Sequence, residues 1–211
     1  EYNMFAVVTD GNITSFPKGN KGITIGDNQY PAAIYTLWTE AERNAIGVYT
    51  VEIDNTNKKD EEWYINTNQS YAFGSGKVTA TYGTATAKKI ADTLWTSQDK
   101  TDGKIRKGDD VGDVATEGLK TKKNRMIDNQ CAGLLAPSDW RVIREQETGS
   151  AMDSGWKTWR ANVRTKCNSM QTQITNAANV DALATLFTFT NTGTEENPVW
   201  ERPLGQFPVK E

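Results

Sequence analysis

The strongest fold signal in this sequence is a single stripe of large apolar side chains between residues 156 and 174. Its members recur at intervals of three or four residues, which is the repeat of one face of an α-helix. Asp153 and Ser154 stand just before the stripe, where a helix N-cap is expected. The sequence therefore predicts an amphipathic helix whose apolar stripe consists of Trp156, Trp159, Val163, Cys167, Met170 and Ile174.

Two further segments show helical periodicity. The first begins near Lys120 and is expected to stop at Pro137, because proline removes a backbone donor and clashes with the preceding turn. The second follows Asn179, a candidate N-cap. Each of the three short helices has one apolar stripe, and these stripes can be buried only against one another or against a sheet. The sequence therefore predicts a helical module over residues 120–192. The two additional stripes are Ile127, Cys131 and Leu134, and Val180, Leu183 and Phe187.

The first 95 residues carry the patterns of β-strands. MFAVVTDGNITSF places an Asp-Gly pair between two apolar runs, and SYAFGSGKVTATY places Gly-Ser-Gly between two β-prone runs, so both predict hairpins. VYTVEI alternates as a half-buried strand does. One short helix is expected where Thr39 and Glu42 have capping-box spacing and Gly47 follows. The predicted fold class is α+β, with a β-rich module at residues 1–95.

Two segments have compositions that disfavour a packed core. Residues 96–119 are rich in charge and glycine, which predicts a solvated connector or projecting loop. Residues 193–211 hold three of the six prolines, alternating with Trp200, Leu204 and Phe207. This pattern predicts an extended arm that docks either on its own domain or on a neighbouring subunit.

The residue types narrow the chemistry that the chain can perform. It has no histidine, which removes the commonest general base and metal ligand together with every Ser-His and Cys-His nucleophile. No glycine-rich phosphate-binding loop has the required spacing, and acidic pairs such as Glu61-Glu62 and Asp109-Asp110 lie in polar stretches. We therefore expect no catalytic residue, cofactor or metal site. A two-carboxylate hydrolase of cell wall or polysaccharide is the enzymatic alternative.

Charge and hydropathy limit the classes of partner that the chain is expected to bind. The formal net charge is -3, so no global field attracts nucleic acid or an anionic membrane. No apolar stretch is long enough to cross a bilayer, and the first residues lack the pattern of an export signal. Cys131 and Cys167 both fall on helical stripes, which indicates either reduced core thiols or a disulfide joining two helices.

The stretch GLLAPSDWRVIR combines many chemistry-bearing residues between two helical segments. We interpret it as a structural corner. Leu134 and Leu135 close the first helix, Ser138 and Asp139 satisfy backbone donors at the turn, and Trp140 anchors it beneath the next helix. This interpretation places three tryptophans in the core or at the corner, with an exposed interaction surface as the alternative: Trp140, Trp156 and Trp159.

The arginines around this corner allow two interpretations. Arg160 and Arg164 are one helical turn apart, so with Arg141 and Arg144 they can form a basic face. The interpretation we favour is that the arginines pair with carboxylates such as Asp139 and cover aromatic rings with their stems.

GLLAPSDWRVIR, followed by WKTWRANVRTKCNSM, resembles the signature of the bacteriophage tail assembly chaperone family. In that signature, a Leu-Leu-x-x-Ser/Thr-Asp-Trp corner precedes Trp-x-x-Tyr-Arg-x-x-Leu-Arg. Here Trp159 replaces the tyrosine, Thr165 replaces an aspartate, and a longer insertion follows Arg144. The whole chain is also similar to tail or fibre-associated proteins of tailed phages. The residues that match the signature are Leu134, Leu135, Ser138, Asp139, Trp140, Trp156, Arg160 and Arg164.

The resemblance implies a virion or assembly context. Together with the residue types, it leads us to expect a non-enzymatic virion protein of the phage tail, near the fibre or baseplate, that acts through protein–protein contacts. Its expected partners are other tail proteins, with a homo-oligomer as a further possibility, and its expected site is the virion tail after assembly in the host cytoplasm. The alternative within this context is a fibre assembly chaperone that is not retained in the virion.

Overall fold

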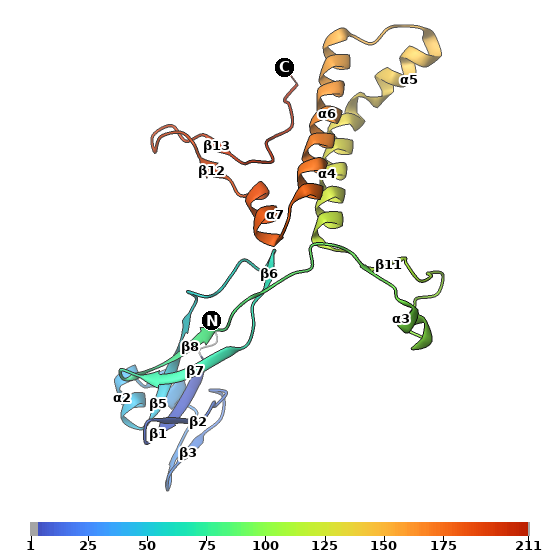
Figure 1. Ribbon diagram of the computed structural model, residues 1–211. Helices are drawn as coiled ribbons and strands as arrows, with labels where there is room; N and C mark the ends of the chain where they lie inside the picture. The colour runs from blue at the N-terminus through green and yellow to red at the C-terminus, as the bar shows by residue number, and fades with distance from the viewer. Residues whose placement is uncertain (1–3, 211) are drawn as a thin grey trace. The chain divides into compact units, whose positions relative to one another are not determined.

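The computed structural model of the chain describes residues 4–210 and divides it into two compact units, Glu1–Thr86 and Ala87–Glu211 (Figure 1). The first unit is a β-sheet with short helices, and the second is mainly helical. The predicted α+β class is confirmed. Residues 87–95, which the sequence placed with the β-rich module, belong to the second unit.

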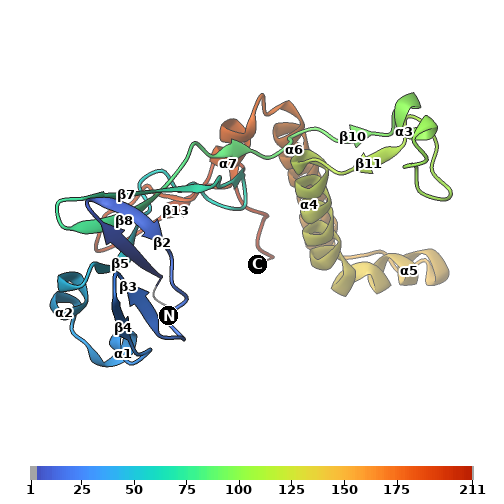
Figure 2. The same cartoon turned by 90° about the horizontal axis from the view of Figure 1, so that it is seen from below.

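The first unit is built on a five-stranded sheet in the order β2-β1-β5-β8-β7 (Figure 2). Strands β5 and β8 pair in parallel, and the other neighbouring strands pair antiparallel. Both expected hairpins are present, because Asp10 and Gly11, and likewise Ser75 and Gly76, adopt the positive φ angles that a tight hairpin turn requires. The strands are β1 (Phe5–Thr9), β2 (Asn12–Ser15), β5 (Val48–Asp54), β7 (Gln69–Gly74) and β8 (Lys77–Tyr82).

Each face of this sheet has its own apolar cluster. On one face, Phe5 and Val48 are buried together with Ile34 and Tyr35 of the first short helix, and on the other face Ala6, Val51, Val78 and Ala80 are buried together. The expected capping box between Thr39 and Glu42 starts the second helix. The remaining elements of the unit are β3 (Ile23–Ile25), β4 (Asn28–Tyr30), α1 (Ile34–Leu37), α2 (Glu40–Ala45) and β6 (Tyr64–Ile65), and β9 (Thr86–Ala87) spans the boundary between the units.

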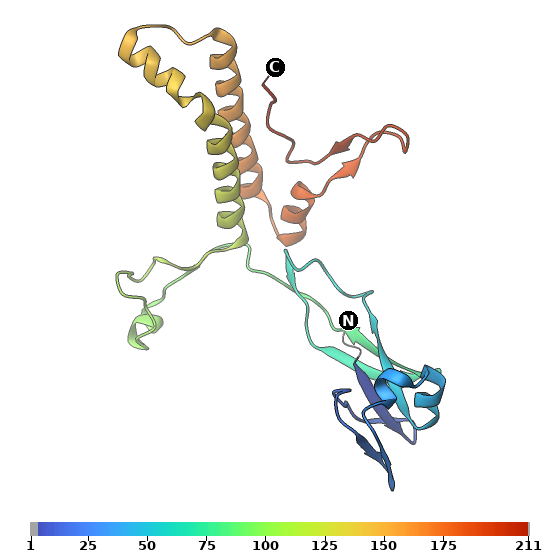
Figure 3. The same cartoon turned by 180° about the vertical axis from the view of Figure 1, so that it is seen from behind.

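The second unit contains an antiparallel pair of long helices, α4 and α6, which lie side by side in Figures 1 and 3. Of the two candidate caps, Asp153 and Ser154, Asp153 is the N-cap, since its side chain accepts bonds from the backbone N–H groups of Gly155 and Trp156. Asn179 caps the last helix as expected. The helices are α3 (Ser97–Thr101), α4 (Leu119–Leu135), the 3-10 turn η1 (Ala136–Ser138), α5 (Asp139–Thr148), α6 (Ser154–Asn176) and α7 (Val180–Phe187).

The predicted stripes of α4 and α6 hold the two helices together. Ile127 on α4 and Val163, Met170 and Ile174 on α6 have no exposed surface or almost none. Cys131 and Cys167 are both buried and free, so the thiols serve as small apolar groups in this interface.

The charged segment 96–119 is mostly exposed, as expected of a connector or projecting loop, but it contains a short helix and a short strand that its composition did not predict. These are α3 and β11 (Val114–Thr116). Strand β11 pairs with β10 (Thr93–Leu94), which lies just before the segment. The indole Nε1 of Trp95 and the Arg106 Nε both donate to Asp109 Oδ2, at 2.9 and 2.8 Å. Because its charges bond to one another, the segment has order without a hydrophobic core of its own.

The predicted arm begins in a short hairpin of β12 (Thr190–Asn191) with β13 (Trp200–Glu201). It then follows α6 of the same unit, where the Trp159 Nε1 donates to the Pro208 carbonyl at 3.0 Å. Of the two expected docking sites for the arm, the structure shows its own domain.

Candidate interaction surface

A buried arginine of α6 holds the corner between α4 and α5. Arg160 is only 4% exposed, and its Nη1 donates to the Leu135 carbonyl at 2.9 Å and to the Ser138 hydroxyl. Its Nη2 donates to Asp139 Oδ1 at 2.6 Å. We call Leu135, Ser138, Asp139 and Arg160 the corner cluster. The cluster satisfies a carbonyl at the end of α4, which has no partner within its own helix.

The polar residues of the corner act differently from the prediction. Ser138 and Asp139 do not cap α5: the Ser138 hydroxyl donates to the Leu135 carbonyl at 2.8 Å, and no side-chain cap bond is made at the start of α5. Asp139 bonds to Arg160 instead, as the carboxylate-pairing interpretation expected. Leu134 closes α4 as predicted but is 36% exposed, and Leu135 is half-buried.

Trp140 does not lie beneath the next helix, so that prediction is wrong. Pro137 stands in the first turn of a new helical segment, a position proline favours, and the chain continues through η1 into α5. This places Trp140 on α5, where it is 49% exposed, and no residue of α5 is buried. Figures 1 and 3 show α5 extending from the end of the α4–α6 pair.

Cations and tryptophan rings alternate across α5 and α6. The Arg141 guanidinium carbon lies 4.6 Å from the Trp140 ring centroid and 4.7 Å from that of Trp156, so it sits between the two rings. The Arg144 guanidinium lies 5.4 Å from the Trp140 ring. We call Arg144, Trp140, Arg141 and Trp156 the cation–aromatic stack. Each such contact contributes about 0.5–1 kcal/mol at an exposed site.

An ion pair also links α5 to α6. The Lys157 Nζ donates to Glu145 Oε1 at 2.6 Å, and this bond lowers the pKa of the Glu145 carboxyl below its usual value. Together with the Arg141 contact, this ion pair links the side chains of α5 to α6 beyond the corner cluster. Helix α5 is therefore held by polar and cation–π contacts, with both its apolar and its charged groups accessible.

The tryptophans of α6 are half-buried, between the two alternatives that the sequence allowed. Trp156 and Trp159 meet edge to face with ring centroids 5.5 Å apart, and the Lys210 ammonium lies 5.3 Å from the Trp156 ring. Arg164 is exposed and makes no ion pair with any described residue. The basic face is thus supplied by α5 and Arg164, because Arg160 is buried.

The three apolar residues of the arm have different environments. Leu204 is fully buried, Phe207 is half-buried, and Trp200 is 56% exposed. The backbone N–H of Leu204 donates to the Leu186 carbonyl at 3.1 Å, which ties the arm to the end of α7. Leu204 therefore anchors the arm, whereas Trp200 does not.

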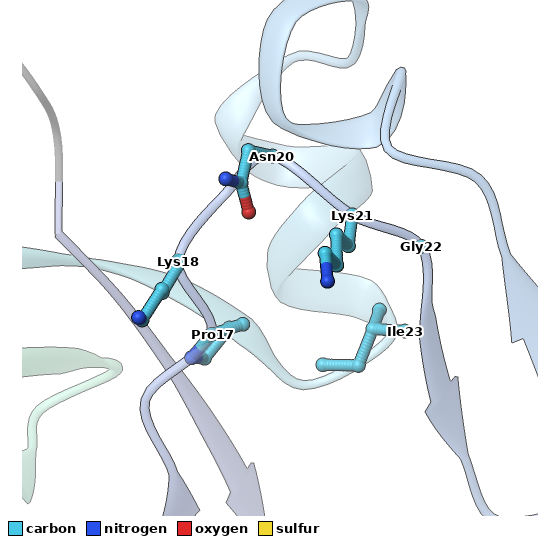
Figure 4. Close-up of a pocket in the computed structure, with 6 residues that line it drawn as sticks. All are labelled: Pro17, Lys18, Asn20, Lys21, Gly22 and Ile23. Atoms are coloured by element: carbon cyan, nitrogen blue, oxygen red, sulfur yellow. The ribbon is translucent and has the colours of Figure 1, made fainter.

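The other described parts of the chain have fewer features of a functional site. The pocket in Figure 4, of about 440 Å³, is formed by a single loop and is lined by Lys18 and Lys21 with no carboxylate or nucleophile beside them. Within residues 4–210 no group of three or more His, Cys, Asp or Glu side chains is placed to hold a metal ion. None of the helices in that range is both long and apolar enough to span a membrane.

Comparison of the chain with protein-family models, curated proteins and solved structures gave no match.

Sequence reasoning missed α5 itself, and with it the exposed side chains Val142 and Ile143. Two signals in the sequence point to this helix: proline favours the first turn of a helix, and Gly149, which ends α5 at a positive φ, is the residue type that favours that position. The Glu145–Lys157 pair was also missed, because residues twelve positions apart on different helices have no local spacing rule.

Proposed function

We propose that this protein is a non-enzymatic component of a phage tail, near the fibre or baseplate, which holds other tail proteins through direct contacts. The observation that carries the proposal is α5, a helix with no buried residue that presents Trp140 and Ile143 to solvent. An exposed tryptophan flanked by arginines is typical of the residues that dominate binding energy at protein interfaces.

The resemblance to the tail assembly chaperone signature supports the phage context. The corner cluster consists of four residues that match the signature: Leu135, Ser138, Asp139 and Arg160. In this chain the signature residues bond the end of α4 and the start of α5 to α6, and these bonds orient α5 relative to α4. The proposed partners are other tail proteins or further copies of this chain, and the proposed site is the virion tail.

Because these residues match a chaperone signature, they also favour a second candidate function, a fibre assembly chaperone that leaves before the virion matures. Mass spectrometry of purified virions distinguishes the two. Peptides of this chain in a fixed ratio to known tail proteins support the virion component, and their absence, with the protein abundant in infected cells, supports the chaperone.

The proposal that the protein is not an enzyme has a separate test. Purified protein is incubated with host cell wall and with host surface polysaccharide, and soluble products are measured. Turnover that disappears when a single carboxylate is replaced by its amide would overturn the non-enzymatic proposal.

A further inference from the structure

Helix α5 has one face that combines apolar and cationic groups. Trp140, Ile143 and Arg144 are separated by three and four residues and so share a face of the helix. Trp140 is 49% and Ile143 56% exposed, while Val142 is exposed on the opposite side of the helix from Trp140. These side chains belong to a helix of 10 residues with no core contact, so the exposure is not a scattered single case but a property of the whole element.

The guanidinium groups of this face are oriented but not neutralised. Arg141 is held between two tryptophan rings and Arg144 lies over one of them. Neither forms an ion pair with any residue in the described part of the chain. A guanidinium stacked on a ring keeps its N–H edge available for a bidentate bond to a carboxylate, and stacking reduces the side-chain entropy that such a bond costs.

The acidic side chains nearby are mostly engaged already. Asp139 is bonded to Arg160, Glu145 to Lys157, and Asp153 caps α6. Glu147 is the remaining acid on α5, against the two stacked arginines and the exposed Arg164. Among the groups here without an ion pair to a described residue, Arg141, Arg144 and Arg164 stand against Glu147 and Asp153. This surface therefore carries a small excess of unpaired positive charge, although the chain as a whole is acidic.

We infer that α5 and the cation–aromatic stack bind an acidic segment of a partner protein, which also places an apolar side chain against Trp140 and Ile143. The inference rests on the proposed function, because it supplies the chemistry of the partner in those protein–protein contacts. Carboxylates of the segment bond to Arg141 and Arg144, and the apolar group covers the ring face and the isoleucine. A phosphate backbone would leave Ile143 uncovered, which favours a polypeptide.

The test is a selection from a library of random peptides displayed on a carrier, with the purified full-length chain as the target. Recovered peptides should be enriched in Asp and Glu next to Leu, Phe or Trp. The affinity of a recovered peptide, measured by titration calorimetry, should fall at least about tenfold in Trp140→Ala and in Arg144→Gln. It should also fall as the salt concentration rises.

Trp200→Ala is the matched control, because Trp200 is a similarly exposed tryptophan on the arm at 56% exposure and should leave peptide affinity unchanged. Recovered peptides without acidic enrichment would overturn the inference, as would binding that is indifferent to Trp140→Ala and Arg144→Gln. Tighter binding of single-stranded DNA or of phosphatidylglycerol vesicles, lost in the same variants, would overturn it in favour of those ligands.

The outcomes separate this inference from the proposed function. Virions that contain the chain, together with peptide selection that ignores α5, leave the function standing and reject the acidic partner. Virions and infected cells in which the chain contacts no tail protein reject the function, while the peptide selection still reports on the chemistry of α5.

Discussion

The Arg160 guanidinium on α6 donates to the Leu135 carbonyl at 2.9 Å and to the Asp139 carboxylate at 2.6 Å, which ties the end of α4 and the start of α5 to a single side chain. Arg160 is 4% exposed, whereas the Asp139 side chain remains 55% exposed. The arginine is thus the buried member of the pair, and the orientation of α5 depends on it.

Replacing Arg160 by alanine should destabilise the protein by about 2–3 kcal/mol, since hydrogen bonds to a charged group are lost and the part-buried Leu135 carbonyl keeps no charged partner. The measurement is urea unfolding followed by circular dichroism. Arg164→Ala is the matched control, one turn further along α6 and exposed, and should change the free energy of unfolding by less than about 0.5 kcal/mol. Equal effects of the two substitutions would show that the corner cluster is not a stabilising feature.

Asp153→Ala should destabilise the second unit by about 1 kcal/mol, because the carboxylate accepts bonds from two N–H groups in the first turn of α6. Thermal unfolding monitored by circular dichroism measures the loss. Asp153→Asn is the control, since asparagine is an equally good N-cap, and it should retain most of the stability. If asparagine were as harmful as alanine, charge at the helix terminus rather than capping would be the main effect.

The elements with a local signal were predicted from the sequence. The stripe of α6, the caps Asp153 and Asn179, and the Asp10-Gly11 hairpin each depend on residues close in sequence, and the structure contains them all. The capping box of Thr39 was found for the same reason.

The candidate surface was predicted only in part, because it depends on contacts between distant residues. Trp140 was expected in the core or at the corner, beneath the next helix. Its environment is instead set by where α5 points, and Arg160, far along the chain, bonds to the start of α5. The order of segment 96–119 was missed because the bond from Trp95 to Asp109 compensates for a composition that indicates disorder. Long-range polar contacts of this kind leave no periodic pattern in the sequence.

Stability should fall in acid partly through Asp92. The backbone N–H of Gly118 donates to Asp92 Oδ1 at 2.6 Å and the Thr121 hydroxyl to Oδ2 at 2.9 Å, next to the start of α4. These bonds, the backbone one first, lower the pKa of the Asp92 carboxyl from its usual value. A depressed folded-state pKa stabilises the fold above the unfolded pKa of about 3.9, and this contribution is lost as the pH falls through the folded-state value.

Asp92→Asn should therefore lower the urea midpoint at pH 7 and have a diminishing effect below about pH 4. Glu147→Gln, at an exposed acid on α5, is the control and should have little effect at pH 7. A difference between wild type and Asp92→Asn that is independent of pH would contradict the role of the ionised carboxylate.

The two thiols should resist modification in the folded protein. Burial, followed by the neighbouring Cys131 thiol, raises the pKa of Cys167 to about 11, so the reactive thiolate is scarce at pH 8. Ellman's reagent should react slowly with the native chain and fully in urea. Because the folded pKa is raised, the contribution of this thiol to stability is complete below about pH 9 and is lost towards pH 11. Rapid stoichiometric labelling of the native protein would show that α4 and α6 separate readily.

Asp109 should hold the segment between β10 and β11 in its ordered form. Its Oδ2 accepts from the Trp95 indole at 2.9 Å and from Arg106 at 2.8 Å, and these bonds, with that from Trp95 first, lower the pKa of its carboxyl. Asp109→Ala removes the shared acceptor, so backbone amides of residues 96–113 should exchange with deuterium at least about tenfold faster. Asp110→Ala is the matched control: its ion pair with Lys100 spans 3.7 Å between exposed side chains and contributes little, so exchange should hardly change. The same acceleration in both variants would mean that net charge, and not the Asp109 bonds, keeps the segment ordered.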